Sequence, residues 1–303
     1  MAPRTSKGVR KVEMLYQSYH VAHTLEEAVS LLESANGATV RPIAGGTDLM
    51  LQLHERLARA DVLVDISGVP EIQDIRLSDG TVHVGAAVTY SQILDSAVLK
   101  RYAPLLAEAS RTVGATQIRN MGTVGGNLGT ASPAGDSLPP LYALDASVTL
   151  TSSKGERNLP ITAFIQGYRR TDLRAGELIK EISFPALPQG AGSVFVKFGL
   201  RQSQAIAVVN VSVVLHVRQE RVERAAVALG AVAPMVVRSP AVEKLLLGQL
   251  LSEDLFEQAG EAVQQDISPI DDVRGSAAFR RHLAGALLRE ALASARRRSL
   301  AAN

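Results

Sequence analysis

The sequence predicts an α+β fold, and three observations support this class. With 303 residues, the chain is long enough for about two domains. Its first part alternates short strand and helix signals around two glycine-rich bends, and its last part has three strand signals followed by helical ones. Strands that precede a run of helices are typical of α+β architectures. We therefore expect a mixed N-terminal domain and a second domain built from a sheet and helices.

The N-terminal part reads as helix, strand, helix and strand. Thr24 and Glu27 have the spacing of a capping box, which predicts a helix that begins at Leu25. A strand over residues 39–44 then runs into the first glycine bend, and a helix over residues 49–57 follows it. A second strand is expected over residues 61–66. A glycine bend between a strand and a helix is an arrangement that places an anion at the start of the helix.

The middle part is expected to begin with a β-hairpin that turns at Ser78-Asp79-Gly80. Helical signals run over residues 89–113, and the second glycine bend comes next. A helix is expected over residues 136–144. Further strands are expected over residues 72–77, 81–86, 147–151, 157–159 and 178–184. The proline and glycine residues in 185–192 are typical of a linker.

The last part has strand signals over residues 194–201, 209–217 and 221–230. In the middle one, valine and leucine alternate with Asn210, Ser212 and His216, which predicts a sheet with one buried face. Helices are expected over residues 240–247, 254–265 and 277–298. We therefore expect a three-stranded antiparallel sheet that packs against a group of helices.

The two glycine bends are the strongest functional signal. The first contains Ala44-Gly45-Gly46-Thr47-Asp48, and the second contains Thr123-Val124-Gly125-Gly126-Asn127. Glycine allows a ligand to approach the main chain closely, and successive exposed N–H groups form concave sites for anions. Two such sites suit a ligand with two linked phosphates, although a Gly-Gly pair on its own is most often an ordinary turn. The pattern predicts binding of a nucleotide-like cofactor.

Composition excludes several classes of protein. The net charge of +2 indicates no nucleic-acid partner, and the absence of cysteine excludes disulfides and thiolate-held metal clusters within this chain. No apolar run reaches the ~20 residues of a membrane helix, and no apolar segment of a secretory signal follows the basic start. We therefore expect a cytoplasmic protein. Basic clusters, expected to be solvated tails, lie at Arg4, Lys7, Arg10 and Lys11 and at Arg296-Arg297-Arg298.

Two charged residues outside the bends have competing explanations. Asp136 follows the second bend, where its carboxylate could accept hydrogen bonds from sugar or ribityl hydroxyls or cap the following helix. Lys197 lies within a strand pattern, where it could face solvent or hold a positive charge over an electron-rich cofactor. No histidine or carboxylate cluster has a convincing metal-binding spacing.

With these motifs assembled, the chain resembles the FAD-binding medium subunit of the molybdenum hydroxylases, the group of carbon monoxide dehydrogenase and xanthine dehydrogenase. The resemblance extends from about Leu15 to Leu292. Its segments are Tyr19 with Leu25-Glu26-Glu27-Ala28, both glycine bends, Thr130-Ala131-Ser132-Pro133, Asp136, Gly167-Tyr168-Arg169-Arg170-Thr171, Gly230-Ala231-Val232-Ala233-Pro234 and Asp271-Asp272-Val273-Arg274-Gly275-Ser276.

The resemblance implies a specific domain organisation. Residues 1–187 would form a FAD-binding domain of the PCMH (vanillyl-alcohol-oxidase-like) type, with subdomains over about 12–66 and 67–187. Residues 190–295 would form the C-terminal domain of three-stranded antiparallel sheet and helix bundle. FAD would lie between the two N-terminal subdomains. The residues implied to bind it are Pro42, Ile43, Ala44, Gly45, Gly46, Thr47, Asp48, Leu49, Thr123, Val124, Gly125, Gly126, Asn127, Asp136, Ile179 and Lys197.

The resemblance also implies partners and a role in a larger oxidoreductase. The chain would carry FAD and would work with a large molybdopterin-binding subunit and a small 2Fe-2S subunit, as a dimer of heterotrimers. Electrons from the iron–sulfur clusters would pass through FAD to an external acceptor. Two alternatives remain at this stage: a stand-alone flavoprotein of the same fold that oxidises its own substrate, and a scaffold protein that has lost FAD.

Overall fold

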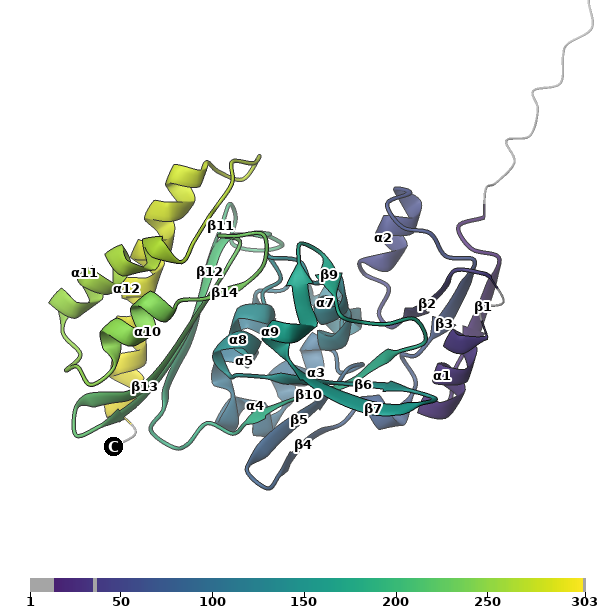
Figure 1. Ribbon diagram of the computed structural model, residues 1–303, viewed down its shortest axis with the longest axis horizontal. Coiled ribbons are helices and arrows are strands. Elements are labelled where there is room, and N and C mark those ends of the chain that lie inside the picture. The colour runs from purple at the N-terminus through teal and green to yellow at the C-terminus, as the bar shows by residue number, and fades with distance from the viewer. Residues whose placement is uncertain (1–13, 35–36, 302–303) are drawn as a thin grey trace, which may run out of the picture.

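The computed structural model describes residues 14–34 and 37–301, which form three successive bodies along the long axis of the molecule (Figure 1). The N-terminal basic cluster at residues 4–11 lies outside the described residues. Arg298 was expected to lie in a solvated tail, but it belongs to the last helix and forms an ion pair with Glu108. Within the described residues, no helix is both long and apolar enough to cross a membrane.

The N-terminal body is a small parallel sheet with the strand order β1-β3-β2. As predicted, Thr24 caps α1, because its side chain accepts the backbone N–H of Glu27. The first glycine bend connects β2 to α2. The elements are β1 (Ser18–Val21), α1 (Leu25–Glu33), β2 (Val40–Ile43), α2 (Leu49–His54) and β3 (Val62–Asp65).

The central body is an antiparallel sheet with the order β4-β5-β10-β6-β7, and short helices pack against one of its faces. After a 3-10 turn at Pro70–Ile72, its strands are β4 (Ile75–Ser78), β5 (Thr81–Gly85), β6 (Ser147–Ser152), β7 (Gly155–Pro160) and β10 (Leu178–Pro185). Its helices are α3 (Tyr90–Asp95), α4 (Ala97–Tyr102), α5 (Pro104–Arg111), α6 (Thr116–Met121), α7 (Val124–Thr130) and α8 (Leu138–Ala143). Small elements follow at α9 (Ile161–Phe164), β8 (Ile165–Gly167) and β9 (Arg170–Thr171).

Two expectations for the central body need correction. The helical signal over residues 89–113 is three helices, because Ser96 caps α4 in an extended conformation and Pro104 starts α5. The second glycine bend is largely helical: Thr123 caps α7, and Val124, Gly125, Gly126 and Asn127 form its first turn. Glycine is a poor helix former, so local preference gives little sign of this helix.

The C-terminal body is a four-stranded sheet with the order β11-β12-β13-β14, rather than the three strands expected. A short strand, β14, pairs with β13 after the chain turns back. Helices cover the outer face of the sheet (Figure 1). The elements are β11 (Gly192–Gly199), β12 (Ala207–Arg218), β13 (Arg221–Gly230), β14 (Val237–Arg238), α10 (Pro240–Leu246), α11 (Glu253–Ala262), a 3-10 turn (Val263–Gln265) and α12 (Ala277–Ala301).

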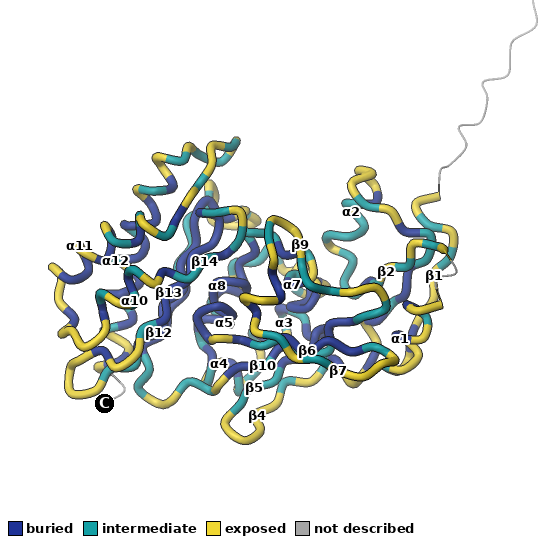
Figure 2. The backbone as a smooth tube through the Cα atoms, in the orientation of Figure 1, coloured by how far each residue is buried: buried dark blue, intermediate teal, exposed yellow. Residues whose placement is uncertain are grey.

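The sheet of the C-terminal body is buried on both faces, so the expectation of one buried face is wrong. Residues 207–215 of β12 are all buried, including Asn210 and Ser212 (Figure 2). The outer face packs against α12, and the inner face packs against α5 and α8 of the central body. The polar positions of the alternating pattern therefore mark a contact between bodies and not a solvated surface.

Close packing between β11 and α12 makes Gly192 a sensitive position. A Cβ atom on Gly192 would lie 2.1 Å from the carbonyl oxygen of Ala295, so the strand and the helix would have to separate. We expect Gly192→Ala to lower the free energy of unfolding by about 2 kcal/mol, the range seen for overpacked cores, in a urea titration. Gly68 is the matched control, because a Cβ there meets no atom of the described residues within 4 Å. An equal loss in Gly68→Ala would contradict this account.

Candidate cofactor site

The first glycine bend presents a row of free main-chain donors. The backbone N–H groups of Gly45, Gly46, Thr47 and Asp48 have no hydrogen-bond acceptor among the described residues. Gly46 has φ +66°, a conformation that glycine adopts without strain. The bend is partly exposed, so an anionic ligand can take the place of water at these donors. Successive unpaired N–H groups of this kind make a phosphate site.

The fold brings the two glycine segments into direct contact. Gly45 lies against the backbone of Met121, where an added Cβ would come 1.7 Å from the carbonyl oxygen. Asp48 accepts a hydrogen bond of 2.7 Å from the Oγ1 of Thr130, at the far end of α7. The N-terminal and central bodies are thus joined at the bend, as expected if both segments serve one ligand.

The second glycine segment differs from the first because its backbone N–H groups already donate hydrogen bonds within the protein. The N–H of Val124 donates to Val88, that of Gly125 donates to Ala86, and that of Gly126 donates to the side chain of Thr123. The expectation that both bends offer free main-chain amides is therefore correct for the first bend only. The exposed face of α7 instead presents glycine residues, so no side chain there would block a ligand from the main chain.

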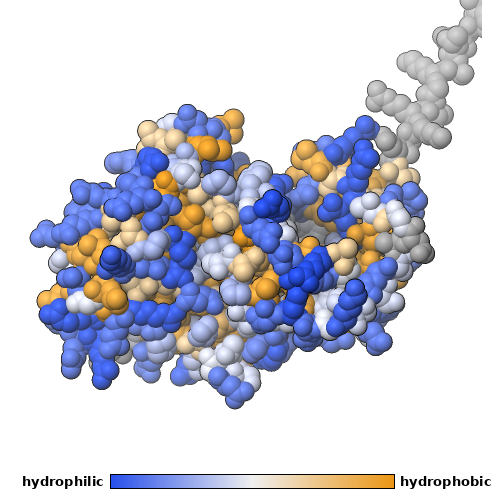
Figure 3. Space-filling model, viewed as in Figure 1, coloured by the Kyte–Doolittle hydropathy of each residue, from blue (hydrophilic) through white to orange (hydrophobic). Residues whose placement is uncertain are grey.

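That open surface is formed by Gly126 and Gly129, which are both exposed on α7. Within the part of the chain that the structure describes, a Cβ on Gly126 would meet only the Oγ1 of Thr123, at 3.0 Å, and a Cβ on Gly129 would meet only Ile179, at 3.6 Å. Ile179 itself is buried in β10. The bond between Asp48 and Thr130 and the position of Gly129 beside Ile179 place the first bend, α7 and β10 next to one another, and we call this region the cradle. Figure 3 shows the surface recessed between the lobe that carries α2 and the rest of the molecule.

Other predicted residues support this cradle. Ile43 and Leu49 pack in the small core beneath the first bend, and Ala44 packs on the neighbouring cluster. Pro42 pairs with Val64 in the sheet. Asn127 accepts a hydrogen bond of 2.8 Å from Ser137, and its amide NH₂ donates to none of the residues that the structure describes.

Asp136 and Lys197 come together in a second cluster. The Nζ of Lys197 donates to the Oδ2 of Asp136 at 2.5 Å and to the carbonyl oxygen of Thr112 at 3.1 Å. Asp136 also accepts hydrogen bonds from the side chains of Thr112 and Asn210, and it is 7% exposed. Burial raises the pKa of Asp136, while the ammonium of Lys197 and the donors of Asn210 and Thr112 oppose that rise. Lys197 therefore neither faces open solvent nor is free of a counter-ion.

Thr112 and Asn210 are site residues that sequence reasoning missed. Asn210 pairs with Lys197 across β11 and β12, and both side chains lie on the inner face of the sheet. The available signal was the polar pair Asn210 and Ser212 within a strand of valines, which we interpreted as belonging to the face of the sheet that is not buried. Thr112 gave no such signal, because threonine at a helix C-terminus is unremarkable.

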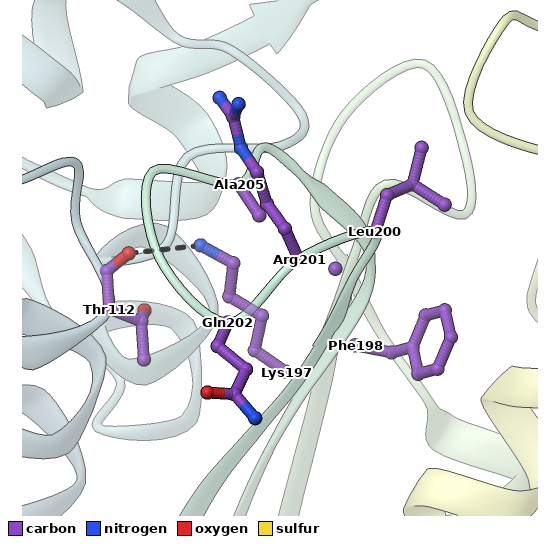
Figure 4. Close-up of a pocket in the computed structure, with 8 residues that line it drawn as sticks. Thr112, Lys197, Phe198, Leu200, Arg201, Gln202 and Ala205 are labelled. Atoms are coloured by element: carbon purple, nitrogen blue, oxygen red, sulfur yellow. Dashed lines mark hydrogen bonds between the residues drawn. The ribbon is translucent and has the colours of Figure 1, made fainter.

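The pocket beside this cluster has a volume of about 430 Å³ (Figure 4). Thr112 and Lys197 line one side, and residues 198–202 with Ala205 line the rest. Lys197 extends toward Thr112, whereas Phe198 and Leu200 point away from it. A ligand in this pocket would meet the polar side of β11.

Comparisons with known proteins agree on one family. Residues 11–187 match the family model described as the FAD binding domain in molybdopterin dehydrogenase, and residues 195–295 match the CO dehydrogenase flavoprotein C-terminal domain.

Among relatives, the glyceraldehyde dehydrogenase medium chain of Sulfolobus acidocaldarius is 34% identical over 274 residues, which cover 90% of this chain and 96% of the relative. A putative xanthine dehydrogenase FAD-binding subunit of Escherichia coli K12 is 30% identical, with 92% of this chain and 96% of the relative covered. A structure of the carbon monoxide dehydrogenase of Hydrogenophaga pseudoflava superposes with a TM-score of 0.89 at 30% identity and covers 93% of this chain and 98% of that one.

Replacing the glycines of the cradle by alanine should have two different effects on the melting temperature of the protein without ligand. Gly45→Ala should lower the melting temperature, because its Cβ would collide with the backbone at Met121. Gly126→Ala should leave it unchanged or raise it, because alanine favours helix and only one side chain is near. Thermal unfolding followed by circular dichroism checks both variants, and the opposite order would contradict the packing described.

Removing the positive charge of Lys197 from its buried pair with Asp136 should lower the free energy of unfolding. Lys197→Met leaves the carboxylate of Asp136 buried without its counter-ion, which typically costs about 3 kcal/mol. The double variant Lys197→Met, Asp136→Asn should recover most of this loss at pH 7, because no buried charge remains. Urea unfolding measures both, and a double variant less stable than the single one would refute the pairing.

The pH dependence of the Lys197→Met variant follows from the same pair. Without the ammonium, burial holds the pKa of Asp136 further above its ordinary value. A raised folded-state pKa favours the native state at low pH, and this contribution is lost as pH rises through it. The free energy of unfolding that Lys197→Met loses relative to the unaltered protein should therefore increase from pH 4 to pH 8. A loss that is constant over this range would contradict the assignment.

Proposed function

Because this chain belongs to the FAD-binding subunits of the molybdopterin dehydrogenases, the family of the carbon monoxide and xanthine dehydrogenases, we propose that it is the electron-transfer subunit of a heterotrimeric molybdenum hydroxylase. It would take electrons from the iron–sulfur clusters of a small partner chain and pass them to an external acceptor. A large molybdopterin-binding partner would carry out the substrate chemistry. The names of the relatives support this role, since several are medium chains of dehydrogenases.

The observation that carries this proposal is the cradle at the first bend. Four free N–H groups in a row suit the diphosphate of FAD, and the glycine surface of α7 allows the cofactor to lie against the main chain. Bound FAD supplies reversible redox chemistry at its ring system. The residues we propose for binding are Pro42, Ile43, Ala44, Gly45, Gly46, Thr47, Asp48, Leu49, Thr123, Val124, Gly125, Gly126, Asn127, Asp136, Ile179 and Lys197.

The contacts divide these residues by role. Gly45, Gly46 and Thr47 would donate main-chain hydrogen bonds, and Asn127 would donate from its free amide. Val124 and Gly125 would act through packing, since their N–H groups are already bonded. Ile179 would provide an apolar wall beside Gly129.

Asp136 has a double role in this proposal. Its Oδ2 already accepts from Lys197 and Thr112, whereas among the described residues its Oδ1 accepts only from Asn210. Each carboxylate oxygen has two lone pairs, so Oδ1 can accept one further hydrogen bond from a cofactor hydroxyl. The same carboxylate would hold the ammonium of Lys197 at the wall of the pocket.

The domain organisation belongs to the proposal as well. We propose that residues 1–187 form the FAD-binding domain, with subdomains over about 12–66 and 67–187, and that residues 190–295 form the domain that helps to dock partner chains. Pairing of two trimers and a cytoplasmic location remain predictions.

Blocking the glycine surface should remove the cofactor without unfolding the chain. We expect Gly126→Val to weaken FAD binding at least about tenfold, or ~1.4 kcal/mol, because the branched side chain would occupy the cradle. Titration of FAD into the apoprotein, followed by flavin fluorescence, gives the dissociation constant. Gly68→Ala serves as the control, and unchanged affinity in Gly126→Val would remove α7 from the site.

The proposed complex can be tested by purification. A tagged chain expressed with its neighbouring genes should copurify with two further chains and with molybdenum and iron. A chain that purifies alone with FAD and oxidises a substrate by itself would instead establish the stand-alone flavoprotein.

A further inference from the structure

The loop over residues 200–206, between β11 and β12, is the part of the pocket wall that the proposed function leaves without a role. Leu200, Arg201, Gln202 and Ala205 all line the pocket that contains Lys197 (Figure 4). The placement of this loop therefore decides how far the pocket is open beside Lys197.

The loop is closed by contacts between its own residues. The guanidinium of Arg201 donates two hydrogen bonds to the carbonyl oxygen of Gln204, at 3.1 and 2.7 Å. Gln204 has φ +53°, which closes the turn. At the neck, a Cβ on Gly199 would lie 2.7 Å from Ala205, so the two stems touch. With its interior closed by these contacts, the position of the loop depends on what holds its two stems.

Both stems are held by one other segment, residues 271–280 at the start of α12. Phe279 packs edge-on against Phe198 of the first stem, with ring centroids 5.9 Å apart. Arg274 donates to the carbonyl oxygen of Ala207, the first residue of the second stem, at 2.9 Å. Arg280 donates to the next carbonyl, that of Val208, at 2.8 Å.

Asp272 organises these two arginines. Its Oδ2 accepts from Arg274 at 2.6 Å, and its Oδ1 accepts from Arg280 at 2.5 Å. Arg280 is 1% exposed and also bonds the carbonyl oxygen of Ala231, so its charge depends on Asp272 for compensation. The bonds from Arg274 hold the pKa of Asp272 well below its usual range, which keeps the carboxylate ionised.

We propose that Asp272, acting through Arg274 and Arg280, is a positioning residue that fixes the loop over residues 200–206 beside the flavin pocket and thereby limits the access of the electron acceptor. The inference rests on the proposed function in one respect, namely that this pocket faces bound FAD. The clamp itself, from Asp272 to the second stem, requires no cofactor.

Arg274→Gln is the most informative variant. It removes the bond to Ala207, and since Arg274 is partly exposed and Arg280 keeps its carboxylate, the fold should persist. Asp272→Asn is the stronger variant, but it leaves Arg280 buried without a full counter-ion. Glu257→Gln is the matched control, because it breaks an arginine–carboxylate pair in α11 and α12 away from the loop.

The experiment uses the full chain with bound FAD and has two readouts. The first is trypsin cleavage after Arg201, followed by mass spectrometry. We expect it to be about tenfold faster in Arg274→Gln, as for loss of one hydrogen bond to a charged group, and unchanged in Glu257→Gln. The second is the rate at which ferricyanide reoxidises the dithionite-reduced flavin, which should rise in Arg274→Gln alone.

The outcomes separate the two proposals. Unchanged cleavage in Arg274→Gln, or faster cleavage with an unchanged rate of reoxidation, overturns the positioning role. Failure of the unaltered chain to bind FAD refutes the proposed function instead, and the cleavage comparison still decides whether the clamp exists.

Discussion

The buried carboxylate of Asp136 is the interaction on which the arrangement of the molecule depends. It accepts hydrogen bonds from Thr112 at the end of α5, from Lys197 of β11 and from Asn210 of β12, and so it joins the central body to the C-terminal sheet. Two charges buried together are costly to remove from water, and the hydrogen bonds that Thr112 and Asn210 donate to the carboxylate offset part of this cost. Hydrogen bonds are directional, so this cluster constrains how β11 and β12 lie against the central body.

The sequence was sufficient to predict most of the elements and the family. Capping by Thr24, the hairpin at Asp79 and Gly80 and the long C-terminal helix all follow from local preferences that the structure confirms. The errors came from tertiary contacts. Asn210 and Ser212 were assigned to a solvated face because alternation shows only that two faces differ, and not what covers the polar one. Only packing against α5 and α8 explains their burial.

The sequence predicted which segments come together at the candidate site, but it did not predict how each of them would contact a ligand. Both glycine segments do meet at one place, but Gly125 is required by the approach of Ala86, and its N–H is already bonded. Glycine at a bend can mean free donors, close packing or an open surface, and the three cases look the same in the sequence. The hydrogen-bond partners of each N–H group distinguish them, and these depend on segments that lie far away in the chain.

The end of α12 contacts the central body. Arg298 pairs with Glu108 of α5 and donates to the carbonyl oxygen of Ser193, across a separation of 190 residues from Glu108. Since α12 covers the outer face of the sheet, that face stays unprotected until α12 itself has been synthesised. Nascent chains would thus hold a hydrophobic β-sheet open on the ribosome, and chaperone occupancy during synthesis should persist until the C-terminal helix emerges.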